Sequence, residues 1–249
     1  MNRPISAAMI AAIIFAGAAH ALPPTKSSAK PAVRVAATPA VKAPGALRDW
    51  TKVATDTPAG NVVLGNPRAR VKVIEYLSFT CSHCAAFSVE SGPVLKEQFI
   101  RSGSLSIEYR PIGRDFPDLG ATILARCAGG LGFANAADEI FARQSEWLSL
   151  AMGFMERDAK RFVLDTPLGQ IRAGAQANGL IDLMLARGLS RERIDACFAN
   201  EKLLASILAN GEAARKVIKG TPAIVINGTM VKEFTWAGVE PLLRAGGAR

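Results

Sequence analysis

The sequence EYLSFTCSHCAAFS, residues 75–88, contains two cysteines that are three positions apart, Cys81 and Cys84. They follow an apolar run, residues 71–77, whose content of Val, Ile and Tyr is typical of a buried β-strand. The residues after them, from 82 to about 101, favour a helix with a kink at its proline. A C-x-x-C pair between a buried strand and a helix indicates redox chemistry, a metal site or a structural disulfide.

The elements on either side of this stretch predict an α/β fold. Residues 104–112, SLSIEYRPI, alternate as a second strand, which completes a βαβ unit with a right-handed crossover. A helical pattern then runs over about residues 114–216. Strand character returns at 223–231, where Asn227-Gly228 is a strong hairpin signal, and a helix at about 236–244 follows. We therefore expect a βαβ unit and a ββα unit separated by an all-helical subdomain.

Apolar spacing within the helical pattern predicts which residues face the core. Three- and four-residue steps place five residues on one helix face, namely Leu119, Ile123, Leu124, Cys127 and Leu131. The same spacing places Ile194, Cys197 and Phe198 on the apolar face of a later helix. Both remaining cysteines of the chain therefore lie on apolar helix faces.

The N-terminal residues have the pattern of a secretory signal peptide. Residues 1–4 include the basic Arg3, residues 5–17 are apolar and uncharged, and Ala19-His20-Ala21 fits a cleavage site. An uncleaved anchor is the alternative, but this apolar run is shorter than the roughly 20 residues that span a bilayer. We expect residues 1–21 to be removed and the mature chain to be a soluble periplasmic protein, in a compartment where disulfides persist.

Residues 22–57 are rich in Ala, Pro, Lys, Val and Thr and show no helical or strand period, which predicts a flexible segment before a domain at 58–249. A heptad stalk is the alternative, and the scattered prolines argue against it. This segment holds six basic and two acidic residues, so about half of the positive charge lies on it. The domain lacks a dense basic cluster, so we do not expect nucleic-acid binding. Attraction of the segment to anionic lipid headgroups stays open.

The C-x-x-C pair fits neither a haem site nor a zinc site. Haem attachment needs a histidine directly after Cys84, where Ala85 stands. Structural zinc needs a second compact pair of ligands, but Cys127 and Cys197 lie far along the chain and apart from each other. We therefore expect no metal. A structural C-x-x-C disulfide is a further alternative, although so small a ring gains little loop entropy.

A redox role has a physical mechanism. If a helix begins near Cys81, its free N–H groups and its dipole favour an anion there. We expect an exposed Cys81 that attacks as a thiolate and an inward-facing Cys84 that resolves the mixed disulfide. His83, between them, could stabilise a negative sulfur by charge or by a hydrogen bond. A stabilised thiolate favours the reduced form, which makes the disulfide a stronger oxidant.

The residues Phe79-Thr80-Cys81-Ser82-His83-Cys84, joined to KGTPAIVING at residues 219–228, resemble the DsbA-like thiol:disulfide oxidoreductases of the thioredoxin superfamily. The resemblance covers roughly residues 62–246, and the helical insertion is also DsbA-like. It implies a thioredoxin-like fold with an inserted all-helical subdomain. It also implies unfolded or extended exported proteins as substrates, a membrane partner that reoxidises the protein, and no cofactor beyond the redox-active disulfide.

The resemblance also assigns roles to individual residues. Cys81 would be the nucleophile and Cys84 the resolving cysteine, with Ser82-His83 as the dipeptide that tunes the potential. In Thr221-Pro222, the proline would be the cis-proline beside the disulfide, and Thr221 would offer backbone hydrogen bonds to a bound peptide. Glu75 would be a buried acid that exchanges a proton near Cys84; its alternative is an exposed acid on an edge strand.

Cys127 and Cys197 admit two interpretations. Paired, they would close a loop of 70 residues and stabilise the fold by about 4 kcal/mol in the loop-entropy description. Unpaired, they would be inert core thiols. Export favours the bridge, and some DsbA-like proteins carry a second disulfide in this subdomain.

Three functions remain open from the sequence. The first is an exported oxidase that introduces disulfides into other proteins. The second is an isomerase or reductase on the same fold, since Ser82 and Thr221 depart from the residues of the family's type member. The third is a protein that binds copper(I) through its soft thiolates. Because residues 22–57 lack a heptad, we expect a monomer.

Overall fold

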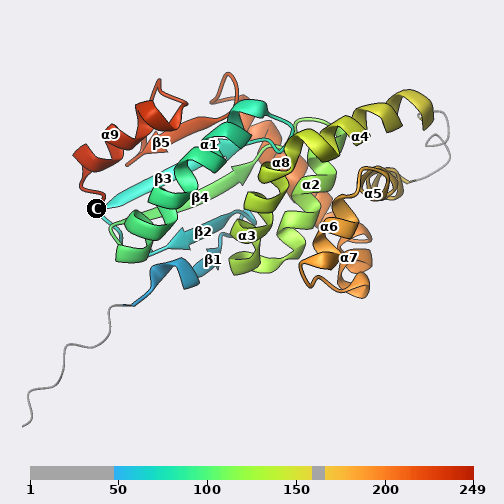
Figure 1. Ribbon diagram of the computed structural model, residues 1–249, viewed down its shortest axis with the longest axis horizontal. Coiled ribbons are helices and arrows are strands. Elements are labelled where there is room, and N and C mark those ends of the chain that lie inside the picture. Colours follow the sequence, from blue (N-terminus) through green and yellow to red (C-terminus); the bar gives the residue numbers. More distant parts are fainter. Residues whose placement is uncertain (1–47, 159–165) are drawn as a thin grey trace, which may run out of the picture. The chain divides into compact units, whose positions relative to one another are not determined.

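A computed structural model describes residues 48–158 and 166–249. The expected signal peptide, residues 1–21, and residues 22–47 of the expected flexible segment lie outside the described residues. The described chain contains one mixed sheet, with helices on both of its faces (Figure 1). The expected α/β architecture, with a helical insertion between a βαβ unit and a ββα unit, is confirmed.

Six strands form the sheet in the order β1-β2-β4-β3-β5-β6. They are β1 (Ala54–Asp56), β2 (Val62–Gly65), β3 (Val71–Leu77), β4 (Leu105–Pro111), β5 (Ala223–Ile226) and β6 (Thr229–Met230). β3 and β4 pair in parallel, which the βαβ prediction requires, and the other neighbouring strands are antiparallel. Asn227 and Gly228 have positive φ and form the predicted hairpin turn. β3 therefore lies inside the sheet and carries its side chains into the core.

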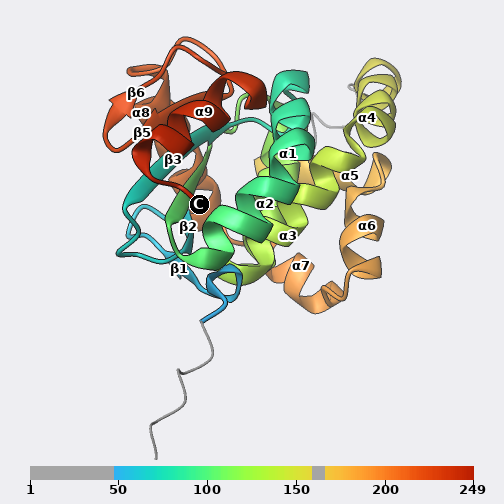
Figure 2. The same cartoon turned by 60° about the vertical axis from the view of Figure 1, so that its left-hand side comes forward.

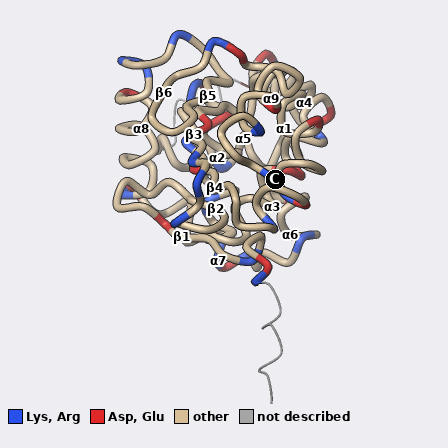
Figure 3. The backbone as a smooth tube through the Cα atoms, turned by 90° about the vertical axis from the view of Figure 1, so that its left-hand side faces the viewer, with Lys and Arg blue, Asp and Glu red and all other residues tan. Residues whose placement is uncertain are grey.

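Two helices of the βαβ and ββα units cover one face of the sheet. These are α1 (Ser82–Val94), which continues as a π-helical segment, η2 (Leu95–Ile100), and α9 (Trp236–Gly246). Figure 3 views the sheet edge-on, with α1 and α9 on one side and α8 (Glu201–Arg215) on the other. The α-helical pattern changes to the π-helical segment just after Pro93, which has no N–H to donate, at the position where the sequence predicts a kink.

The helices of the inserted subdomain are α2 (Phe116–Cys127), α3 (Gly129–Ala142), α4 (Gln144–Asp158), α5 (Pro167–Ala177), α6 (Leu180–Ala186) and α7 (Arg191–Phe198). The helices α4 to α7 lie away from the sheet (Figure 2), whereas α3 contacts β1 and β2. The predicted face of the first helix is partly wrong, because α2 ends at Cys127 and Leu131, on α3, is 44% exposed. Asp115 and Thr166 cap α2 and α5 with their side chains, each directly before a first turn that contains proline.

Cys127 and Cys197 form a disulfide that joins α2 to α7, with an S–S distance of 2.12 Å and a Cα–Cα distance of 6.0 Å. Of the two interpretations of these cysteines, the structure has the paired one, which the expected export favours. The bridge lies between elements of the helical subdomain that are 70 residues apart in sequence.

The predicted boundary of the flexible segment is wrong at its C-terminal end. Within residues 22–57, Trp50–Lys52 form a 3-10 helix, η1, and β1 adds an edge strand that pairs antiparallel with β2. Trp50 packs on Gly103, where a Cβ would lie 2.5 Å from the indole, and Gly103 also has a positive φ of 79°. These tertiary contacts order a stretch that has no periodic pattern of its own.

Charges of both signs are spread over the described chain (Figure 3). Many of them form ion pairs on the surface, such as Arg244 with Glu240 on α9. None of the described helices combines the length and the apolar character that a membrane crossing needs.

Candidate redox site

Cys81 immediately precedes α1 and serves as its N-cap residue, with extended backbone angles (φ −91°, ψ 118°). The first N–H groups of an α-helix have no partner within the helix, so they are free to bond an anion. Two of them, from His83 and Cys84, donate to the Cys81 sulfur. The helix start expected from the sequence is therefore the place where the structure puts this sulfur.

Hydrogen bonds to the sulfur lower the pKa of Cys81 to about 4. The largest contribution is the bond from the Cys84 thiol, and the Thr221 side chain and the backbone N–H groups of Cys84 and His83 add to it. They outweigh burial, which alone would raise the pKa of this thiol. Cys81 is therefore a thiolate at neutral pH.

Cys84 has the opposite environment, one helical turn further along α1. Its side chain is fully buried, and burial is the main cause that raises its pKa above the ordinary range of a thiol. Its bond to Cys81 and the nearby Glu75 raise the pKa further. The pair thus consists of an anionic sulfur and a protonated one, which is the division of roles expected for a nucleophile and a resolving thiol.

The expectation that Cys81 is exposed is wrong, because only 6% of the residue is accessible. The loop that contains Thr221 and Pro222 covers it, and the carbonyl oxygen of Thr221 lies 3.1 Å from the Cys81 sulfur. The thiol form donates to this oxygen, whereas the thiolate accepts from the Thr221 side chain. The Thr221–Pro222 peptide bond is cis.

Ser82 and His83, the residues between the cysteines, are both exposed. His83 acts on the Cys81 sulfur through its backbone N–H, while its ring packs edge-on against Phe234, with 5.6 Å between the ring centroids. Phe234 lies in the loop between β6 and α9 and is 46% exposed. No sequence pattern predicts this contact between His83 and Phe234.

A groove of about 560 Å³ opens beside the cysteine pair. Its walls are the segments 217–223 and 230–234, together with His83. Three large apolar side chains of these walls, Val217, Met230 and Phe234, are 42–60% exposed. The groove therefore has an apolar lining next to the Thr221 backbone.

Glu75 lies on β3, inside the sheet, and is 3% exposed, so it is the buried acid of the two alternatives. Burial and the nearby Asp138 raise its pKa to about 8, and Lys96 opposes them. One carboxylate oxygen of Glu75 has no hydrogen-bond partner among the described residues. Lys96, from η2, pairs with Asp138, from α3. At neutral pH, Glu75 therefore holds a proton beside Cys84.

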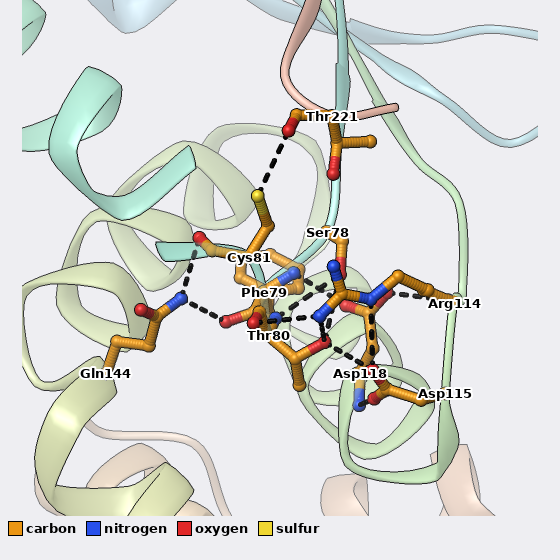
Figure 4. Close-up of polar contacts among 9 residues, drawn as sticks. All are labelled: Ser78, Phe79, Thr80, Cys81, Arg114, Asp115, Asp118, Gln144 and Thr221. Carbon is orange, nitrogen blue, oxygen red and sulfur yellow. Dashed lines mark hydrogen bonds and ion pairs between the residues drawn. The ribbon is translucent and has the colours of Figure 1, made fainter. Parts of the chain in front are cut away.

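The loop from β3 to Cys81 is held by side chains of the helical subdomain (Figure 4). Asp118 accepts from the backbone N–H of Phe79 at 2.6 Å and from that of Arg114 at 2.7 Å. Burial raises the pKa of Asp118 to about 6 in spite of these bonds. The Arg114 guanidinium donates to the carbonyl oxygen of Thr80 at 2.9 Å, and the Thr80 hydroxyl donates to Asp115 at 2.6 Å.

On the other side of the same loop lies Gln144, the first residue of α4 (Figure 4). Its amide nitrogen donates to the carbonyl oxygen of Phe79 at 2.7 Å and to that of Cys81 at 2.9 Å. The contacts of Gln144, Asp118 and Arg114 with this loop were not predicted from the sequence. Of these three residues, only Asp118 has a sequence signal, because it is a charged residue at the start of an otherwise apolar helix face.

Among residues 48–158 and 166–249, no group of three or more His, Cys, Asp or Glu side chains is arranged to hold a metal ion.

Comparison with known proteins matches the thioredoxin family to residues 57–245 of this chain. A Rickettsia typhi protein, provisionally named a protein-disulfide oxidoreductase, is 29% identical over 188 residues, which are 74% of this chain and 61% of that protein. A Rickettsia conorii protein with the same kind of name is 29% identical over 85% of this chain and 66% of its own length. The chain thus spans less than two thirds of these curated relatives.

Two solved structures share the fold. A protein described as a protein-disulfide isomerase from Novosphingobium aromaticivorans is 30% identical, with a TM-score of 0.68 over 74% of this chain and 95% of that one. The α-DsbA1 protein of Wolbachia pipientis is 19% identical, with a TM-score of 0.60 over 79% of this chain and 94% of that one. The chain therefore belongs to the thioredoxin family, and it has the DsbA-like form of the fold, with a helical subdomain between the βαβ and ββα units.

Proposed function

We propose that this protein is a thiol:disulfide oxidoreductase that introduces disulfides into other proteins by exchange at Cys81 and Cys84. The observation that carries the proposal is the contrast between the two sulfurs, with the pKa of Cys81 lowered to about 4 and that of Cys84 raised. Stabilising the Cys81 thiolate stabilises the reduced protein. The Cys81–Cys84 disulfide is then a strong acceptor of electrons from client thiols.

The first step is attack of a client thiolate on the Cys81 sulfur. A bond forms between the two sulfurs, the Cys81–Cys84 bond breaks, and Cys84 departs with the electron pair. A second client thiolate then attacks the client sulfur of the mixed disulfide and expels Cys81 as a thiolate. The client loses two electrons and gains a disulfide, and the protein gains the same two electrons as a dithiol.

Cys84 needs a proton when it departs, because its surroundings disfavour a charged sulfur. Glu75 is the group placed to supply it, since it is buried, interacts with Cys84 and is protonated at neutral pH with a pKa of about 8. When the protein is reoxidised, the same carboxylate accepts the proton back. In this role Glu75 exchanges protons with Cys84 and does not contact the client.

The client is an extended or unfolded chain that binds in the groove beside Cys81. The backbone of Thr221 offers hydrogen bonds to an extended peptide, and Val217, Met230 and Phe234 offer apolar contacts. Because Cys81 is only 6% exposed, the client sulfur must approach along the Thr221–Pro222 loop. A folded client with a buried disulfide would not fit this approach.

The place of action proposed here is the periplasm, which the pattern of residues 1–21 supports. There a membrane partner would reoxidise the dithiol after each cycle, and the protein would act as a monomer. N-terminal sequencing of the protein from a periplasmic extract tests the location: a mature chain that begins at Leu22 is expected, and an uncleaved cytoplasmic chain would contradict it.

The test of the activity is oxidative refolding of a reduced, unfolded client that needs several disulfides. The oxidised protein should restore the client's activity in stoichiometric amounts without another oxidant, and a catalytic amount should suffice with oxidised glutathione. The Cys81→Ser variant is the control. If the oxidised protein leaves the client reduced, the oxidase function is wrong.

Isomerase activity is the second candidate, and one observation favours it: the Novosphingobium aromaticivorans neighbour is described as a protein-disulfide isomerase. A client with scrambled disulfides and no net need for oxidation separates the two functions. If the protein is an isomerase, its reduced form should restore the activity of this scrambled client. An oxidase recovers the reduced client and leaves the scrambled one largely inactive.

A further inference from the structure

Gln144 contacts the redox loop in a way that the exchange chemistry described above does not use. The side chain is buried, with 8% of the residue exposed, and comes from the helical subdomain rather than from the sheet that carries the cysteines. A side-chain amide has two N–H donors on one nitrogen. Gln144 directs this nitrogen at two carbonyl oxygens of one loop, those of Phe79 and Cys81 (Figure 4).

The carbonyl oxygen of Cys81 links Gln144 to the start of α1. It accepts the first backbone hydrogen bond of α1, from the N–H of Ala85 at 3.1 Å, and the Gln144 amide at 2.9 Å is its second donor. Fixing this oxygen fixes the ψ angle of Cys81 and therefore the direction in which its side chain leaves the backbone. The sulfur then points at the N–H groups of His83 and Cys84 and at the side chain of Thr221, which are groups that stabilise its charge.

Packing surrounds the helix start to which Gln144 belongs. This helix start lies at the junction of α3 and α4, where the indole N–H of Trp147 donates to the carbonyl oxygen of Ile140 at 2.8 Å. The ring of Phe141, on α3, packs on that of Phe79 with 4.9 Å between the centroids. The junction and the loop therefore form one packed unit, and a shift of α4 would be transmitted to Cys81.

We propose that Gln144 is a positioning residue of the redox centre, whose amide fixes the backbone of Cys81 and keeps its sulfur against the Cys84 thiol and Thr221. The inserted subdomain thereby sets the reactivity of a cysteine that belongs to the thioredoxin part of the fold. The inference rests on the proposed redox role of Cys81 and Cys84. It adds a residue that touches neither the client nor a reacting atom.

The test compares Gln144→Met with a matched control, Gln176→Met. Methionine keeps the length of the side chain and removes both donors. The amide of Gln176, on α5, donates only outside the redox site, to Asp182 at 3.2 and 3.3 Å. For each variant, the Cys81 pKa is measured from the ultraviolet absorbance of the thiolate, and the equilibrium constant with glutathione is measured together with the urea midpoint of unfolding.

Gln144→Met should raise the Cys81 pKa by about one unit and make the disulfide about tenfold less oxidising against glutathione, which is about 30 mV. Gln176→Met should leave both quantities unchanged. If both variants lower the unfolding midpoint but neither changes the pKa, Gln144 only supports the fold and the inference is wrong.

A second variant, Gln144→Asn, keeps the amide but withdraws it by one methylene, and should shift the Cys81 pKa in the same direction by a smaller amount. If neither Gln144 variant folds, the residue serves the fold rather than the thiol, which also overturns the inference. If the unmodified protein cannot be reduced and reoxidised reversibly at Cys81 and Cys84, the proposed function itself fails, and that result is distinct from an unchanged Gln144 variant.

Discussion

The two cysteine pairs of this protein have the same chemistry and opposite surroundings. Cys81 and Cys84 lie three residues apart at a helix start, where N–H groups stabilise a thiolate beside a groove. Cys127 and Cys197 are 70 residues apart and join two helices, with Cys127 only 2% exposed. The first pair has a stabilised anion and a path for a client. The second is a bonded bridge between two helices, so the surroundings of a cysteine pair decide whether it exchanges or stays bonded.

Removing either sulfur of the Cys81–Cys84 pair should have the largest effect on exchange. Cys81→Ser should leave no measurable disulfide exchange, because serine does not form a disulfide. Cys84→Ser should accumulate a mixed disulfide between Cys81 and the client, since the resolving thiol is gone. Nonreducing electrophoresis detects the trapped species. Exchange that persists in Cys81→Ser would show that another sulfur, either Cys84 or one of the second pair, can act as the nucleophile.

The double variant Cys127→Ala/Cys197→Ala should affect stability and leave chemistry intact. Loss of a bridge that closes a loop of 70 residues lowers the free energy of unfolding by about 4 kcal/mol at most. Urea denaturation measures the loss, and client oxidation below the unfolding transition should stay within about twofold of the unmodified protein. A variant that is fully stable but inactive would assign the second bridge to the redox chemistry.

Glu75→Gln tests the proton supply of the first pair, because Glu75 is a buried acid that acts on Cys84. The pKa of Glu75 is raised from 4.5 to about 8 in the folded protein, so its contribution to stability is complete below pH 4.5 and is lost as the pH rises through 8. Between these values, the unmodified protein should lose up to about 1.4 kcal/mol of stability per pH unit from this group.

In Glu75→Gln that loss should be absent, so the variant should become the more stable protein toward pH 8. Glu90→Gln, an exposed change on α1, is the control. Urea midpoints measured across this pH range check the prediction. Parallel pH profiles for Glu75→Gln and the unmodified protein would mean that Glu75 titrates normally and holds no proton for Cys84.

Phe234→Ala should have the smallest effect. The side chain lines the groove and packs on the ring of His83, so its loss should raise the KM for a peptide client by about threefold to tenfold, as expected for about 1 kcal/mol of apolar contact. Leu242→Ala, a similarly exposed apolar residue on α9, should leave the KM unchanged. Equal KM values for the two variants would place the client elsewhere.

Much of the fold could be predicted because its elements carry periodic signals. The strand at 71–77, the Asn227-Gly228 hairpin and the helical insertion all follow from local patterns. β1 could not be predicted, because three residues, Ala-Thr-Asp, carry no pattern and are ordered only by pairing with β2. Local pattern thus identifies elements that are stable by their own sequence and misses those that depend on a neighbour.

The site divides in the same way. Cys81 and Cys84 are recognisable because one motif contains both and a helix start explains their asymmetry. Gln144 and Asp138 are single polar residues on helices of the insertion, and only tertiary packing brings them to the loop and to Glu75. The burial of Cys81 was missed for the same reason, since it is produced by a loop 140 residues away.

The most direct test of the thiolate mechanism is the pKa of the Cys81 thiol, measured in the reduced full-length protein from the ultraviolet absorbance of the thiolate. The Cys84→Ser variant assigns the titration, because Cys81 is then the only free thiol of the pair. The hydrogen bond to the Cys81 sulfur is weakened in this variant. We expect a transition near pH 4 in the unmodified protein. A transition near 9, the ordinary value for a thiol, would contradict it.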